Sequence, residues 1–145
     1  MKSLTLAAAQ TILDAAHAHA RTHDMKPLAI CVLDARGALK SFLADDATSL
    51  SRGDIARGKA NGALALGMGS RALFKRAQDQ PFFIAAATST IGGSLVPVPG
   101  GVLIRDDEGE VIGAVGISGD TSDNDEACAV AGIVAAGLAA DPGEG

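Results

Sequence analysis

At 145 residues with 48% hydrophobic side chains, the chain has the length and apolar content of one domain with a sizeable core, and we expect a single domain over residues 1–145. The net charge of −5 argues against non-specific binding to nucleic acid or to an anionic membrane surface, so neither partner is expected. Aromatic residues make up only 3% of the chain while Ala and Gly abound, which favours close packing of helices and sheet and suits a homo-oligomer.

The N-terminal segment predicts an amphipathic helix that runs to about Thr22 and ends near His23. Ser3 or Thr5 can cap this helix, because a hydroxyl oxygen accepts from the free N–H groups of a first turn. Its apolar residues recur at helical spacing, at Ala9, Ile12, Leu13, Ala16 and Ala20. Polar residues interrupt the segment too often for a signal-peptide core, and no apolar run reaches membrane-spanning length, so a cytoplasmic protein is expected.

A hairpin and two helices are predicted next. Residues 28–33 (LAICVL) and 38–43 are typical of paired strands, and the turn between them, 34–37, ends in a glycine. A second helix is expected to begin within 49–54, and residues 70–80 favour a further short helix. The segment after that gives mixed signals, because its FFIAAA run is typical of a strand, whereas the glycines and prolines that follow are typical of a loop.

The last third predicts a second hairpin, 102–105 and 110–117, around an acidic turn, followed by a final helix. Asp123-x-x-Glu126 matches the acidic form of a capping box at the start of that helix. The helix is expected to extend over the apolar run 127–140. Hairpins separated by helices indicate an α+β fold, in which a mostly antiparallel sheet is flanked by helices.

Gly113, Gly116 and Gly119 run from a strand into the final helix, where backbone N–H groups and the helix dipole can hold an anion. Lys59, among small apolar residues of the second helix, is the expected cationic partner. Against this, Asp120, Asp123, Asp125 and Glu126 crowd the same corner and would repel an anion. The alternatives are therefore an anion site and a corner whose glycines serve close packing alone.

No metal or nucleotide motif is complete. Gly53–Lys59 fits the first positions of a P-loop, but Ala60 stands where Ser or Thr must hold magnesium. His17 and His19 lie about 200° apart around a helix, while His19 and His23 are four residues apart and could share a metal. No acid completes a zinc pattern, so no metal site is predicted. Cys31 and Cys128 are expected to be buried free thiols.

Taken together, several stretches resemble the GlcG/HbpS haem-binding-like family, which includes the C-terminal domain of PduO-type cobalamin adenosyltransferases. They are LTLAAAQTILDAAHAHA, AICVLDARGALKSF, the Lys59-Ala60 pair and PGGVLIRDDEGEVIGAVGISGDTSDNDEACAVAG, in that order. The resemblance implies a profilin-like fold that assembles into a homo-oligomer, and some relatives bind haem. The chain departs from many relatives at Leu43-Ala44-Asp45, where they carry an Arg before the Asp.

The leading hypothesis is a cytoplasmic small-ligand-binding protein with haem or a related tetrapyrrole as the first ligand to test. The expected ligand-binding residues lie at two glycine-containing junctions and their neighbours: Lys59, Gly100, Gly101, Ser118, Gly119, Asp125 and Glu126. His23, at the end of the first helix, is the expected axial ligand of haem. Two alternatives stay open: an enzyme that moves a proton on a small organic acid through Asp125 or Glu126, and an accessory subunit of a catabolic pathway.

Overall fold

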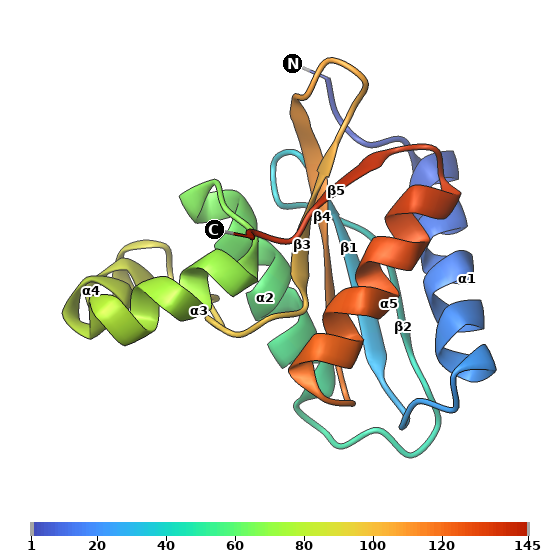
Figure 1. Ribbon diagram of the computed structural model, residues 1–145, viewed down its shortest axis with the longest axis horizontal. Coiled ribbons are helices and arrows are strands. Elements are labelled where there is room, and N and C mark those ends of the chain that lie inside the picture. The colour runs from blue at the N-terminus through green and yellow to red at the C-terminus, as the bar shows by residue number, and fades with distance from the viewer. Residues whose placement is uncertain (1, 145) are drawn as a thin grey trace.

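The computed structural model describes residues 2–144, which form one five-stranded sheet with helices on both faces (Figure 1). The strand order is β2-β1-β4-β3-β5, and every neighbouring pair is antiparallel. The predicted α+β class with an antiparallel sheet flanked by helices is thereby confirmed. The elements in chain order are α1 (Leu6–Thr22), β1 (Ala29–Asp34), β2 (Leu39–Ala44), α2 (Arg52–Leu66), α3 (Ser70–Asp79), α4 (Pro81–Thr90), β3 (Gly101–Arg105), β4 (Val111–Ser118), α5 (Ser122–Ala135) and β5 (Ala139–Asp141).

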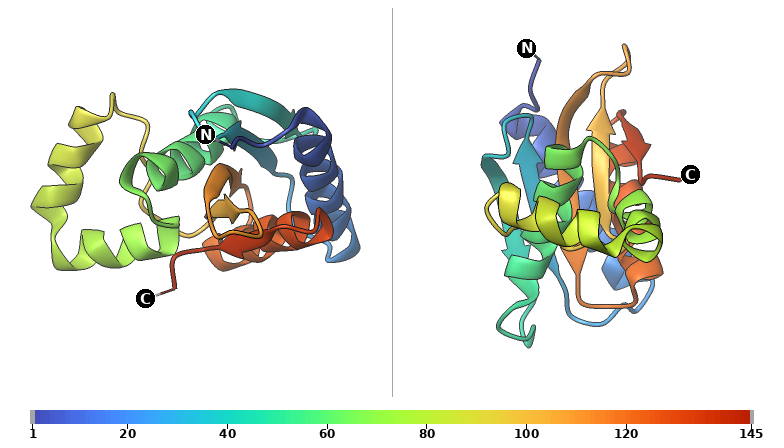
Figure 2. Two further views of the ribbon diagram at one scale, coloured as in Figure 1. Left: turned by 90° about the horizontal axis from the view of Figure 1, so that it is seen from above. Right: turned by 90° about the vertical axis from the view of Figure 1, so that its left-hand side faces the viewer.

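The two faces of the sheet carry different helices. Side chains alternate between the faces along each strand, so Ile30 and Val32 of β1 pack with α1 and α5, whereas Cys31 and Leu33 pack with α2. Both faces are apolar, and all six residues of β1 are buried. The core therefore lies in two layers, one on each side of the central strands β1 and β4 (Figure 2).

Helix α1 begins and ends where the sequence indicates. The Thr5 hydroxyl accepts from the Ala8 N–H and caps the helix. All five residues of the predicted apolar stripe are buried, and they pack against α5, which lies beside α1 (Figure 1).

Helix α2 approaches the sheet so closely that side chains have no room beneath it. Gly101 and Gly116 are cross-strand partners on the face that α2 covers. A Cβ at Gly116 would overlap the Ala56 carbonyl oxygen, and a Cβ at Gly101 would overlap the Lys59 carbonyl. These glycines are thus required for close packing of the helix backbone on the strands.

Helices α3 and α4 form an arm that projects from the body of the molecule (Figures 1 and 2). The expectation of a strand at FFIAAA is wrong, because these residues belong to α4, with Pro81 at its first turn. Ile84 packs with Leu73 and Leu95, and Ala87, three residues later, is also buried. The buried side chains of the FFIAAA run therefore follow the spacing of a helix and not the alternation of a strand.

The C-terminal helix is shorter than expected. Helix α5 ends at Ala135, and Gly137 turns the chain with a φ of 76°. Ala139–Asp141 then pair with β3 as the edge strand β5, so the expected helix over 127–140 is wrong in its last third. Both cysteines are free and buried, as expected. Within residues 2–144, no helix combines the length and apolar content that crossing a membrane requires.

Candidate functional site

Lys59 of α2 and Asp125 of α5 form a buried ion pair, which we call the Lys59–Asp125 junction. The Lys59 Nζ lies 3.3 Å from the Asp125 carboxylate and donates to the Ile117 carbonyl at 2.8 Å. Both residues are almost fully buried, with exposed fractions of 2% and 1%. The Lys59 ammonium therefore reaches inward to the end of β4 and not to the surface.

Two glycines make room for the Lys59 side chain. A Cβ at Gly100 would lie 2.8 Å from the Lys59 Nζ, and Gly100 has a φ of 125°. Gly101 packs on the backbone of α2, and its N–H donates to the Ser70 hydroxyl at 2.7 Å. Both glycines thus lie beside Lys59, as the sequence hypothesis requires.

Ser118 and Gly119 complete the corner between β4 and α5. Ser118 is buried, and its hydroxyl accepts from Arg52 Nη1 at 3.1 Å. Gly119 has a φ of 153° and packs against the backbone of Pro27 and Leu28, where a side chain has no space. Arg52 is a second cation near Lys59 that the sequence reasoning did not single out, since only its packing reveals its partner.

Several N–H groups at the start of α5 already have acceptors. The Asp120 N–H donates to Asp125 and the Thr121 N–H donates to the Asp120 side chain. Thr121 is the N-cap, and its hydroxyl accepts from the Asn124 N–H. The expected capping box at Asp123-x-x-Glu126 is wrong, because the helix begins earlier than that spacing implies.

Glu126 points away from the junction and binds the arm. Its carboxylate accepts from Arg71 of α3 at 2.9 and 3.1 Å, and Arg71 also pairs with Asp123. This bidentate pairing raises the pKa of the Arg71 guanidinium. The structure therefore brings Asp125 to Lys59 but assigns Glu126 to the attachment of the arm.

Burial dominates the ionisation of the junction. It lowers the pKa of Lys59 and raises the pKa of Asp125, while the attraction between the two charges opposes both shifts. Removing either charge alone would leave the other buried without a charged partner.

His23 lies outside the junction, on the other side of the first turn of α5. A pocket of about 340 Å³ is lined by His19, His23, Met25, Asn124 and Ala127. The rings of His19 and His23 stack with centroids 4.0 Å apart. His23 Nδ1 lies 2.8 Å from the His19 carbonyl oxygen, which leaves Nε2 for another partner. The pKa of His19 is lowered, mainly by burial and to a lesser extent by the neighbouring His23.

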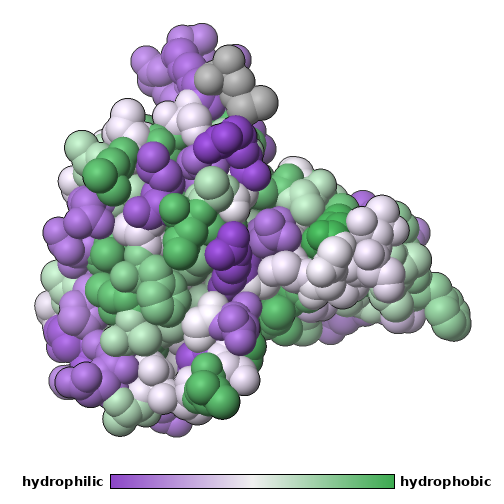
Figure 3. All heavy atoms as spheres, turned by 180° about the vertical axis from the view of Figure 1, so that it is seen from behind, coloured by the Kyte–Doolittle hydropathy of each residue, from purple (hydrophilic) through white to green (hydrophobic). Residues whose placement is uncertain are grey.

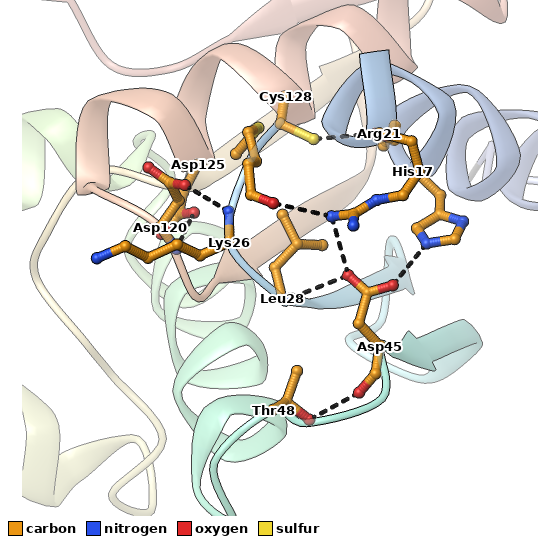
Figure 4. Close-up of polar contacts among 11 residues, drawn as sticks. His17, Arg21, Lys26, Leu28, Asp45, Thr48, Asp120, Asp125 and Cys128 are labelled. Carbon is orange, nitrogen blue, oxygen red and sulfur yellow. Dashed lines mark hydrogen bonds and ion pairs between the residues drawn. The ribbon is translucent and has the colours of Figure 1, made fainter. Parts of the chain in front are cut away.

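His17 takes part in a different network, around Asp45. The Asp45 carboxylate accepts from His17 at 2.7 Å, from the Leu28 N–H at 3.0 Å and from Arg21 at 3.4 Å (Figure 4). This carboxylate ties the chain after β2 to α1, and these hydrogen bonds hold its pKa below the usual range although burial opposes them. In the sequence, Asp45 stands out only because the Arg that precedes this Asp in many relatives is absent. No regular spacing in the sequence predicts its contact with His17.

Residues 2–144 contain no cluster of three or more His, Cys, Asp or Glu side chains arranged to hold a metal ion. The P-loop-like run Gly53–Lys59 lies inside α2, so it offers no phosphate-binding loop. Burial raises the pKa of Cys31 to about 11 and that of Cys128 to about 12, and the Cys128 thiol donates to the Ala16 carbonyl. Neither thiol is set up as a nucleophile.

Comparison with known proteins identifies a family and several similar structures. The family model described as "Haem degrading protein HbpS-like" matches residues 4–134. Protein ORFY of Klebsiella pneumoniae is 27% identical, with a TM-score of 0.84 over 94% of this chain and 92% of that one. PduOC, solved as a haem complex, is 25% identical, with a TM-score of 0.83 over 94% and 96% of the two chains. A double mutant of HbpS from Streptomyces reticuli is 25% identical, with a TM-score of 0.79 over 92% and 87%. No curated protein sequence matches the chain.

Proposed function

The chain belongs to the HbpS-like family, and we propose that it binds haem or a related tetrapyrrole through His23. One observation carries the proposal: His23 lines a pocket with an imidazole nitrogen that its own hydrogen bond leaves free. The haem complex of PduOC, a structural relative over nearly the whole chain, makes haem the first ligand to test.

The donors of the pocket fit haem iron. A histidine imidazole is a common axial ligand, and a hydrogen bond from its other ring nitrogen fixes the ring and makes it a better ligand. The contact between His23 Nδ1 and the His19 carbonyl oxygen supplies that bond. When bound, haem supplies redox-active iron, whereas the protein supplies the axial imidazole and the walls of the pocket.

The pocket wall predicts weak binding. Its five lining residues include no Phe, and the four Phe side chains of the chain lie elsewhere, on β2, α3 and α4. A flat macrocycle gains most of its binding free energy from large apolar side chains that pack on its faces. We therefore expect the pocket to take one edge of the tetrapyrrole, with His23 contributing more than His17 or His19.

Titration of haemin into the purified protein tests this function. The wild type is expected to shift the Soret band, and His23→Ala is expected to weaken the affinity at least about tenfold, as loss of a direct ligand should. His17→Gln is the matched control, because His17 points to Asp45. A wild type that gives no Soret shift would remove haem as the ligand.

The alternative function, proton transfer on a small organic acid, would use the junction. Lys59 would hold the carboxylate, Gly100, Gly101, Ser118 and Gly119 would frame it, and Asp125 would move the proton. Perturbed pKa values of buried groups favour such a site. The geometry gives it less support, since Lys59 and Asp125 are buried and bonded to each other. If glycolate raised the melting temperature of the wild type but not that of Lys59→Met, the result would support this alternative function.

We further propose that the chain self-associates through the arm. Phe82 is 90% exposed and Phe83 45% exposed on α4, and Phe74 of α3 is also exposed. Figure 3 shows hydrophobic residues on the surface of the projecting arm. From the sequence, self-association was expected through an apolar helix over 127–140. The exposed Phe residues of the arm replace that reason, since α5 ends at Ala135 and packs on α1. A cytoplasmic location stays a proposal, with which two reduced thiols are compatible.

A further inference from the structure

We propose that His19, His23 and Met25 form a binding site for a single soft metal ion, Cu(I). The inference goes beyond the haem function, although it uses three residues of the same pocket. It starts from the position of the two histidines, which are four residues apart at the C-terminal end of α1 and therefore lie on one face of the helix.

The two rings lie close together. Their centroids are 4.0 Å apart and their planes differ by 23°. In this stacked arrangement the nitrogen lone pairs, which lie in the ring planes, do not converge on one point. Binding of one ion would therefore turn the rings edge-on to it, a rotation of side chains that histidines four residues apart on one helix face can make.

The third donor comes from the loop after the helix. Met25 is 7% exposed and lines the same pocket as the two histidines. Its backbone is fixed, since the Met25 N–H donates to the Ala20 carbonyl and Arg21 donates to the Met25 carbonyl. Met25 is therefore an anchored residue that belongs to the core cluster and also borders the pocket, and its thioether would turn toward the pocket to bind an ion.

The donor set selects the metal. The pocket lining has no carboxylate, and its remaining residues are Asn124 and Ala127. Hard ions such as Mg²⁺ and Ca²⁺ need carboxylate or carbonyl oxygens, whereas thioether and imidazole ligands suit Cu(I). The buried thiols of Cys31 and Cys128 are poor competitors, because Cys128 is bonded to a carbonyl and both are enclosed in the core.

Anaerobic competition for Cu(I) against a chromophoric chelator tests the site. The wild type is expected to take up one equivalent. His19→Ala, His23→Ala and Met25→Leu are each expected to weaken the affinity at least about tenfold, since even the loss of an outer partner of a metal ligand costs 10- to 100-fold. His17→Gln and the Cys31→Ala/Cys128→Ala double variant should bind as the wild type does.

The result separates this proposal from the haem function. Cu(I) uptake is measured without haemin and the Soret shift without copper, so that each proposal has its own readout. Met25→Leu is expected to lose Cu(I) affinity, and His23→Ala is expected to weaken the binding of both. Three results would overturn the copper site without affecting the haem proposal. The wild type could take up no Cu(I), uptake could survive both histidine substitutions, or uptake could be abolished only by removal of the cysteines. A wild-type protein that takes up Cu(I) but gives no Soret shift with haemin would overturn the haem proposal alone.

Discussion

Lys59 and Asp125 join helices from opposite faces of the sheet, with the lysine nitrogen 3.3 Å from the carboxylate. The contact passes the end of β4, where the Lys59 ammonium also binds the Ile117 carbonyl. Because burial shifts both pKa values against the charged forms, the pair depends on its geometry and on each partner being present.

Lys59→Met should therefore be strongly destabilising. The substitution leaves Asp125 buried without its cation, and removal of one partner of a buried pair costs about 3–5 kcal/mol. Lys59→Met/Asp125→Leu should be less destabilised than the sum of the two single variants, because no lone charge remains. Urea unfolding of all four proteins measures the coupling, and additive effects would show that the pair does not act as a unit.

Gly116→Ala should destabilise the fold by at least about 3 kcal/mol, because its methyl group overlaps the Ala56 carbonyl oxygen of α2, and a backbone atom cannot move aside as a side chain does. The matched control is Gly53→Ala, whose methyl group would lie 3.0 Å from the tip of the half-exposed Phe42 ring. That change should stay within about 1 kcal/mol of the wild type, since it also favours the helix. Equal melting temperatures for the two variants would contradict the close packing of α2.

Asp45→Asn should remove stability that depends on pH. The folded-state pKa of Asp45 lies below its unfolded value, so its contribution is present above about pH 4 and is lost as the pH falls through the folded pKa. Hydrogen bonds to a charged group are each worth about 1.5–3 kcal/mol, so the variant should be less stable by about that amount at pH 6. Chemical denaturation at pH 6 and pH 3 checks this, and a difference that does not narrow at pH 3 would refute it.

Phe82→Ser/Phe83→Ser should reduce self-association. Both side chains are exposed on the arm, and burial of large apolar surface drives association. Light scattering of the wild type is expected to give a mass above that of one chain, and the variant should shift toward the monomer. Leu50→Ser is the control, because Leu50 is 99% exposed but lies in the loop before α2. A monomeric wild type at micromolar concentration would contradict self-association.

The helices and hairpins with regular apolar spacing were predictable from the sequence. The stripe of α1, both hairpins and the start of α2 follow from periodicity and turn residues, as the burial of Ala9, Ile12 and Ala16 illustrates. Errors arose where a short apolar run fits two periods: FFIAAA reads as a strand by composition, whereas Ile84 and Ala87 show helical spacing. The run after Ala135 likewise forms an edge strand, which only pairing with β3 determines.

The candidate site was predictable in part. Lys59, Gly100, Gly101, Ser118 and Asp125 do lie together, because the glycines mark where backbones meet. Their partners were not predictable, since the pairing of Glu126 with Arg71 and of Asp45 with His17 joins residues 55 and 28 positions apart in the chain. No local pattern encodes contacts that arise only when the arm and α1 have packed.

Haem ligation by His23 is tested most directly by removing the imidazole and giving it back. In His23→Gly the protein should lose the Soret shift with haemin, and millimolar free imidazole should restore it, because His23 is exposed and a small ligand can enter the gap it leaves. His17→Gly should bind haemin without added imidazole. A His23→Gly protein with the wild-type Soret band before any imidazole is added would contradict the proposed axial role of His23.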